Sequence, residues 1–148
     1  MIKILPGDPK GPAKRLLEES HALMERLFPS EANHYLSVDA LCVPEVTFLV
    51  AMKGDQTIGC GAVKDFDSYG ELKSIFVDET ARGSGVADAL MRGLEDAARE
   101  RGLTALKLET GNTLYAAHKL YRRHGFSDCG PFGDYKVEPL SIYMQKAL

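Results

Sequence analysis

The chain has 148 residues, of which 45% are hydrophobic and 26% charged, and its formal net charge is −3 at pH 7. This length suits one domain with a full core, and the composition is ordinary for a globular protein. The chain lacks the basic field of a general nucleic-acid binder, and no apolar run approaches the roughly 20 residues of a membrane span. We therefore expect one domain over residues 1–148, with neither a nucleic-acid partner nor a membrane partner.

Three cysteines and four histidines are spread along the chain without the spacing of metal ligands. Cys42, Cys60 and Cys129 are odd in number and form no Cys-x-x-Cys pair, and no His-Glu-x-x-His motif occurs. Free thiols are typical of a reducing compartment, and the N-terminal residues lack the apolar stretch of a signal peptide. We expect a cytoplasmic protein without a metal site.

The first half of the chain predicts one long helix and several strands. Apolar residues recur at helical spacing in the second segment, and β-branched and aromatic residues dominate the fourth. In chain order we expect a strand at 2–5, a helix at 13–28, a break with a short helix at 29–36, and strands at 46–52, 57–66 and 71–77. Strict alternation in the last strand places its side chains on two opposite faces. One face carries Leu72, Ser74 and Phe76, and the other carries Lys73, Ile75 and Val77.

The second half predicts alternating helices and strands, at 83–101 (helix), 104–110 (strand), 112–124 (helix), 126–129 (strand) and 140–148 (strand). The helix at 83–101 has an apolar stripe formed by Val86, Ala87, Leu90, Leu94, Ala97 and Ala98. Its opposite face carries Arg92, Glu95, Asp96, Arg99 and Glu100. Hairpin-connected strands followed by a strand–helix–strand unit predict an α/β fold with a mixed sheet and helices on both faces.

A glycine-rich turn separates the strand at 71–77 from this helix. Arg82 precedes Gly83-Ser84-Gly85, and the first backbone N–H groups of the helix have no partner inside it. Together with the helix dipole they form an anion site that glycines leave open to a phosphate, so a diphosphate fits.

Two other interpretations of this turn stay open, and one is excluded. The glycines could simply make a turn beside a solvated Arg82. A dinucleotide-binding loop is a more distant alternative, because Glu109 ends the next strand at about the expected distance but Asp88 stands where the third glycine should be. A P-loop is excluded because no Gly-Lys-Ser/Thr follows.

Two motifs, in the right order, resemble those of the GNAT N-acetyltransferase family. The first is Arg82-Gly83-Ser84-Gly85-Val86-Ala87, and the second is Leu120-Tyr121 shortly before Gly125-Phe126. The resemblance covers residues 70–126 and implies a mixed, mainly antiparallel sheet of about six to seven strands flanked by about four helices. It also implies direct acetyl transfer from acetyl-CoA to a primary amine of a small molecule, or less favourably of a peptide, and makes a homodimer plausible.

The resemblance assigns roles to individual residues. Tyr121 matches the acid that protonates the departing thiolate, and Glu71 is a candidate base. The alternatives are a core aromatic for Tyr121 and a cross-strand salt bridge with a lysine for Glu71. The implied cofactor-binding residues are Ile75, Phe76 and Val77 for the acetyl and pantetheine groups, Arg82, Gly83, Ser84, Gly85, Val86 and Ala87 for the pyrophosphate, and Asn112.

The acceptor side is expected to involve His34, Tyr35, Asp134 and Tyr135. His34 and Tyr35 follow the first helix, and the other two belong to a turn-rich loop before the last strand. The alternatives are a structural or exposed histidine and a plain hairpin loop. Two further functions stay open: a module that holds CoA without catalysis and, remotely, a dinucleotide-binding oxidoreductase.

Overall fold

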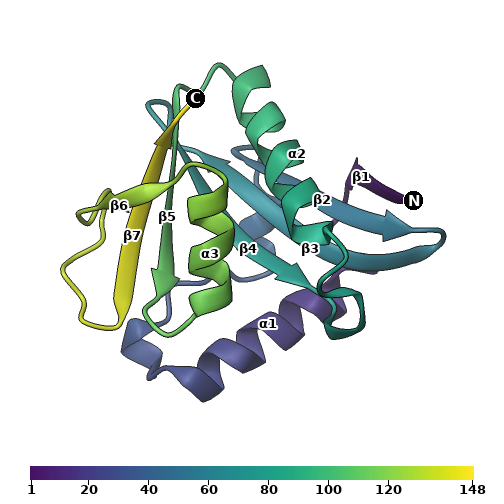
Figure 1. The fold of residues 1–148 in the computed structure, drawn as a ribbon, viewed down its shortest axis with the longest axis horizontal. Coiled ribbons are helices and arrows are strands. Elements are labelled where there is room, and N and C mark those ends of the chain that lie inside the picture. The colour runs from purple at the N-terminus through teal and green to yellow at the C-terminus, as the bar shows by residue number, and fades with distance from the viewer.

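A seven-stranded sheet runs through the computed structural model, which describes residues 1–148 (Figure 1). The strands are β1 (Ile2–Pro6), β2 (Val46–Lys53), β3 (Gln56–Asp65), β4 (Gly70–Val77), β5 (Ala105–Gly111), β6 (Ser127–Cys129) and β7 (Ser141–Ala147). Their spatial order is β1-β2-β3-β4-β5-β7-β6, and only the β4–β5 pair is parallel. This confirms the expected α/β class with a mixed, mainly antiparallel sheet.

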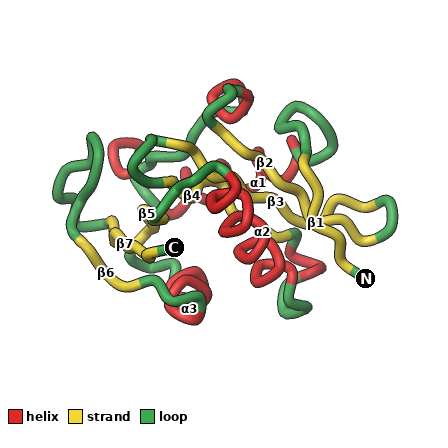
Figure 2. Tube along the Cα trace, turned by 90° about the horizontal axis from the view of Figure 1, so that it is seen from above, coloured by secondary structure: helices red, strands yellow, loops and turns green.

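Three α-helices cover the sheet: α1 (Lys14–Leu27), α2 (Val86–Glu100) and α3 (Tyr115–Arg123). Figure 2 shows α2 and α3 on the same side of the sheet, where they pack on a core of 17 buried residues. Helix α1 packs on the other face, over a second cluster of 8 buried residues. Successive residues of β2 alternate between these cores, Phe48 and Val50 facing α1 and Leu49 and Ala51 facing α2. No helix has both the length and the apolar composition that crossing a membrane requires.

The short helix expected at 29–36 is only a single 3₁₀ turn at Ser30–Ala32. The backbone extends again at Asn33 (φ −93°, ψ 124°). The carbonyl of His34 then accepts a hydrogen bond from the Lys73 side chain on β4, 2.8 Å away, instead of from a helical N–H group. A tertiary contact thus holds this segment extended across the sheet.

The regular alternation expected along β4 is wrong, because the strand contains a β-bulge. The β3–β4 pairing passes from Cys60↔Phe76 to Ala62↔Lys73, so β4 has one extra residue between them. Ser74 in the bulge has a positive φ of 56°. Beyond the bulge the faces exchange: Ile75 packs against the same core as Leu72, whereas Phe76 packs against the core under α1.

Glu95, which the helical pattern places on the charged, outer face of α2, is only 6% exposed. Its carboxylate pairs with the ammonium of Lys146 on β7, which reaches over the core to it. A buried carboxylate requires such a partner, and the sequence pattern of one helix cannot reveal it.

Candidate active site

The parallel strands β4 and β5 pair only at their beginnings, at Gly70↔Leu106 and Glu71↔Lys107. Beyond this point they diverge, and Figure 1 shows the two strands spreading apart toward α1. The bulge at Ser74 lies in the diverging part of β4, where it releases the strand from regular pairing. The fold therefore opens a cleft between β4 and β5.

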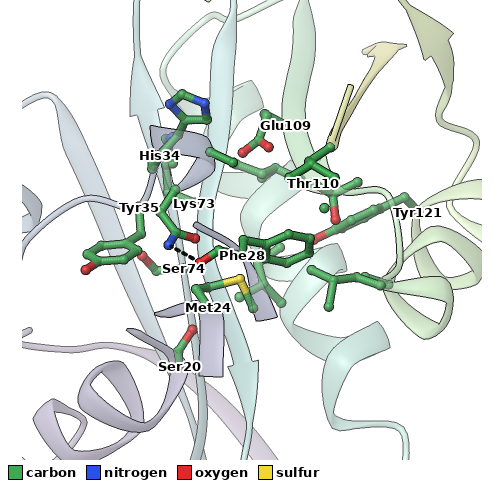
Figure 3. Close-up of a pocket in the computed structure, with 18 residues that line it drawn as sticks. Ser20, Met24, Phe28, His34, Tyr35, Lys73, Ser74, Glu109, Thr110 and Tyr121 are labelled. Atoms are coloured by element: carbon green, nitrogen blue, oxygen red, sulfur yellow. Dashed lines mark hydrogen bonds between the residues drawn. The ribbon is translucent and has the colours of Figure 1, made fainter. Parts of the chain in front are cut away.

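A first pocket fills this cleft (Figure 3). Its polar lining includes Glu109 and Thr110 from β5, Ser74 from the bulge and Tyr121 from α3. Its apolar lining includes Phe28 and Met24 from α1 and its end, and Leu114 and Ala117 from the start of α3. Four segments distant in sequence thus contribute side chains to one small cavity.

Tyr121 lies on the face of α3 that packs on the sheet, and its side chain is 9% exposed. Its ring contacts Phe126 edge-on, with ring centroids 6.0 Å apart, and its hydroxyl is directed into the first pocket, toward the Phe28 ring (Figure 3). Burial, together with the charge of Glu109, raises the pKa of the Tyr121 phenol to about 12. The phenol is therefore neutral near pH 7 and able to donate a proton or a hydrogen bond.

Glu109 lines the same pocket and is not among the catalytic candidates from the sequence. Ser141 on β7 donates its hydroxyl to the carboxylate at 2.7 Å. Burial raises the pKa of Glu109 above its usual value, and this outweighs the opposite influence of Ser141, His34 and Lys73. A carboxylate with a raised pKa is a stronger base than an exposed one.

Ser74 is a second residue that the sequence analysis missed. Its hydroxyl is buried and has no hydrogen-bond partner within the protein, although the side chain lines the first pocket. The positive φ of this non-glycine residue is a strained conformation of the kind that concentrates at functional sites. A sequence signal for it is absent, because serine in a strand is unremarkable without knowledge of the bulge.

Glu71 does not line the first pocket; it lines a second, wider pocket of about 760 Å³. It is 4% exposed, and its carboxylate forms an ion pair with the Lys73 ammonium at 2.9 Å and accepts a hydrogen bond from the Tyr135 hydroxyl at 2.5 Å. The Lys73 ammonium also donates to the Tyr135 hydroxyl at 2.6 Å and to the His34 carbonyl at 2.8 Å. Burial, followed by the hydrogen bond to Glu71, raises the pKa of the Tyr135 phenol.

The structure brings the four acceptor-side candidates together around this second pocket. His34 packs edge-on against the Tyr135 ring, with ring centroids 5.2 Å apart. Tyr35 stacks on His21 and donates its hydroxyl to Glu25 at 2.7 Å, and Asp134 is exposed. His34, Tyr35 and Lys73 line both pockets, so the two cavities are neighbours.

The glycine-rich turn has a backbone that leaves room for an anion at the start of α2. Gly83 and Gly85 have φ values of 80° and 84°, and a Cβ added at either would meet only open space. Gly85 caps α2 without any side-chain hydrogen bond, so the first N–H groups of the helix stay available. A third pocket of about 330 Å³ lies here, lined by Arg82, Gly83, Gly85, Val86, Ala87 and Val77 among others.

Charged groups frame this third pocket. The Arg82 guanidinium lies over the Phe76 ring at 5.4 Å and donates to the Val77 carbonyl. Arg123 of α3 also lines the pocket and pairs with Asp88 at 3.0 Å. Three features fit the diphosphate of a CoA-type cosubstrate. The helix start is uncapped, the two glycines leave space for a ligand, and two guanidinium groups lie beside the pocket.

Ile75 and Asn112, two of the predicted cofactor contacts, do not line the third pocket. Ile75 lines the first pocket, and Val77 at the end of the same strand lines the third, so the end of β4 extends from one pocket to the other. Asn112 lies beyond the end of β5, where its backbone N–H donates to the Leu140 carbonyl and its side-chain oxygen is buried without a partner. No cluster of potential metal ligands occurs in the structure.

Comparisons with known proteins agree with this geometry. Residues 13–126 match the model of the acetyltransferase (GNAT) family. An IAA acetyltransferase from Azospirillum brasilense is 44% identical over 136 residues, which are 90% of this chain and 89% of that protein. A crystal structure assigned as an acyl-CoA N-acyltransferase from Klebsiella pneumoniae superposes with a TM-score of 0.84 at 30% identity, covering 100% of this chain and 98% of the other.

A more distant structure carries the cosubstrate. It is assigned as a streptothricin acetyltransferase of Bacillus anthracis in complex with acetyl coenzyme A, and it matches with a TM-score of 0.65 at 25% identity over 78% of this chain and 69% of that one. The expected family, enzyme class and cosubstrate are thereby confirmed. This chain belongs to the GNAT acetyltransferase family, as an acyl-CoA-dependent N-acetyltransferase that uses acetyl-CoA.

Proposed function

We propose that this protein transfers the acetyl group of acetyl-CoA directly to a primary amine of a small molecule. The observation that carries the proposal is the meeting of Glu109 and Tyr121 in one pocket at the divergence of β4 and β5. A base and an acid on one cavity are what direct transfer needs, because the amine must lose a proton and the thiolate must gain one.

In this proposal Glu109 accepts the proton of the incoming amine. Its raised pKa makes it a stronger base, while Ser141 fixes the carboxylate. The N–C bond forms as the C–S bond breaks, and Tyr121 donates its proton to the departing sulfur. The Ser74 hydroxyl, which has no partner within the protein, would donate a hydrogen bond to the acyl oxygen.

Glu71 keeps a different role in the same scheme. Its carboxylate lines the second pocket and not the first, and it is held there by Lys73 and Tyr135. We propose that this group orders the acceptor side, where His34, Tyr35, Asp134 and Tyr135 would contact the amine substrate. Glu71 as the base stays an untested alternative, and the two carboxylates are compared by substitution below.

The cofactor side is proposed to involve Arg82, the backbone from Gly83 to Ala87, and the end of β4 from Ile75 to Val77. Support comes from the open, uncapped turn and from the third pocket beside it. Asn112 stays a prediction, as do a single domain over residues 1–148 and a homodimer. Light scattering on the purified protein checks the last of these.

An acceptor screen tests the proposal. Thiol release from acetyl-CoA is measured with aliphatic amines, polyamines, amino acids, aromatic amines and N-terminal peptides, and products are identified by mass. Because the Azospirillum brasilense relative is called an IAA acetyltransferase, IAA is included. We expect at least one small primary amine to be acetylated.

The outcomes separate the competing functions. Acetyl-CoA binding without thiol release for any acceptor would favour a non-catalytic CoA-binding module. Acetylation confined to peptides, or to IAA, would contradict the small-amine acceptor. Binding of NADH in place of acetyl-CoA would contradict the whole assignment.

A further inference from the structure

Phe28 closes the end of α1 and places its ring inside the cleft between β4 and β5. Its backbone N–H donates to the Met24 carbonyl at 3.0 Å, and its carbonyl accepts from the Asn33 side chain at 3.4 Å. The side chain is only 7% exposed although it lines the first pocket. Figure 3 shows the ring between Met24 and the hydroxyl end of Tyr121. The backbone N–H and carbonyl groups of Phe28 are thus both held by hydrogen bonds, while its ring lines the first pocket.

The Phe28 ring packs closely against the backbone of Gly111, the last residue of β5. A Cβ added to Gly111 would collide with the Cζ and Cε2 atoms of the Phe28 ring, the latter at 2.7 Å, and would be in tight contact with Cε1 at 3.1 Å. The φ angle of Gly111 is not positive, so its backbone lies outside the left-handed region that favours glycine. Close approach of the aromatic ring, and not backbone conformation, therefore requires glycine at this position.

The cavity bounded by the ring is about 150 Å³, and the acyl group would share it with the attacking amine. Apolar side chains, Met24, Leu114 and Ala117, complete its wall beside Phe28. If the thioester sulfur lies next to Tyr121, a two-carbon acyl group would extend into this space and a longer chain would meet the Phe28 ring. Close-packed aromatic walls resist such intrusion because displacing them costs packing energy on several sides.

We propose that the Phe28 ring, seated against Gly111, is the end wall of the acyl pocket and restricts the enzyme to acetyl over longer acyl groups. The inference rests on the proposed function, because the placement of Tyr121 beside the sulfur sets the direction in which the acyl chain points. Differences of one methylene in an apolar pocket change specificity by about 10- to 200-fold.

Binding of acyl-CoA thioesters of increasing length tests this directly. Calorimetric titration with acetyl-, propionyl- and butyryl-CoA gives dissociation constants for wild type, Phe28→Ala and the milder Phe28→Leu. Phe48→Leu is the matched control, since Phe48 is equally buried but lies in the core under α1. Thermal unfolding checks that each variant is folded, and thiol release with an accepted amine gives the matching ratio of kcat/KM values.

We expect wild type and Phe48→Leu to favour acetyl-CoA over butyryl-CoA by about tenfold or more, and Phe28→Ala to remove most of this preference. Gly111→Ala should weaken acetyl-CoA binding, and the Gly111→Ala, Phe28→Leu pair should regain part of it, because the smaller side chain leaves room for the new methyl group. Such non-additivity is the signature of two residues in contact.

Two results would contradict the proposal that Phe28 is the end wall. The first is an unchanged ratio of acetyl-CoA to butyryl-CoA affinity in folded Phe28→Ala, including the case in which all three thioesters bind more tightly by the same factor. The second is strict additivity of the Gly111 and Phe28 substitutions. Failure of the proposed function is distinguishable from failure of this inference. In that case no amine would be acetylated, while the dissociation constants of the three thioesters would still show whether Phe28 limits chain length.

Discussion

The proposed cofactor side and the proposed acceptor side of this cleft are built in opposite ways. The proposed cofactor side is mostly one stretch from Val77 to Asp88, with backbone amides, two left-handed glycines and Arg82, and only Arg123 comes from elsewhere, on α3. The acceptor side is assembled by Lys73, which ties Glu71 on its own strand to Tyr135 and His34, 62 and 39 residues away in the sequence. A backbone site is encoded locally, whereas a side-chain site of this kind exists only after the chain has folded.

Substitution of the two pocket carboxylates, Glu109 and Glu71, gives the sharpest test of this comparison. Glu109→Gln should lower turnover by about 10²- to 10⁴-fold, the range for losing a general base. Glu71→Gln should mainly raise the KM of the amine. The pH profile supplies the control: the acidic limb of kcat/KM should lie above the usual glutamate range, since burial raises the pKa of Glu109, and should vanish in Glu109→Gln. Loss of that limb in Glu71→Gln alone would make Glu71 the base.

A substitution at the glycine turn tests the cofactor side. Gly85→Asp should weaken acetyl-CoA binding by about 10²-fold or more, because a carboxylate would face the diphosphate and like charges in contact cost several kcal/mol. Gly54→Asp is the matched control, since Gly54 also has a positive φ (60°) and open surroundings but lies in the β2–β3 turn. Equal losses in both variants would mean that general backbone strain, and not the binding turn, is responsible.

Removal of the Lys73 cluster tests the acceptor side. The Lys73→Met, Glu71→Gln pair avoids leaving one buried charge without its partner. It should raise the KM of the amine by roughly tenfold, the equivalent of one or two lost hydrogen bonds, and leave the acetyl-CoA dissociation constant unchanged. Lys53→Met, at the exposed end of β2, is the control. A weaker acetyl-CoA affinity in the pair would show that the two sides are not independent.

The smallest expected effect concerns stability. The pKa of Glu109 is raised in the folded protein, so ionising this group opposes folding as pH rises through that pKa. Glu109→Gln should therefore have a higher Tm than wild type at pH 7, with the difference shrinking below the pKa of an unfolded glutamate. Equal Tm values at pH 7 would argue that Ser141 and the nearby cations fully compensate the buried charge.

Much of the fold is predictable from the sequence, because it follows from local patterns. Period-two and period-3.6 patterns locate every strand and all three α-helices to within a few residues at each end. The errors come from long-range effects. The bulge at Ser74 exchanges the faces of β4, Lys146 draws Glu95 into the core, and Lys73 holds the segment after Ser30–Ala32 extended.

The candidate site likewise has a part that local sequence patterns predict and a part that they do not. Spacing and resemblance identify the turn from Arg82 to Ala87 and the aromatic Tyr121. Glu109 stands out in the sequence only as a feature of a dinucleotide-binding loop, since nothing local shows that β5 diverges from β4 and opens a cavity in front of it. Phe28 and Gly111 are far apart in the chain, and their contact is visible only in three dimensions.

Tyr121→Phe is the most direct test of the central claim that this cleft performs acid-assisted acetyl transfer. Acetyl-CoA affinity by calorimetry and thiol release with an accepted amine are measured on the same preparations. We predict unchanged affinity and turnover lower by about 10²- to 10⁴-fold, because the ring remains while the proton donor is lost. Near-normal turnover with an unchanged pH profile would contradict the claim and leave Tyr121 as an aromatic residue of the core.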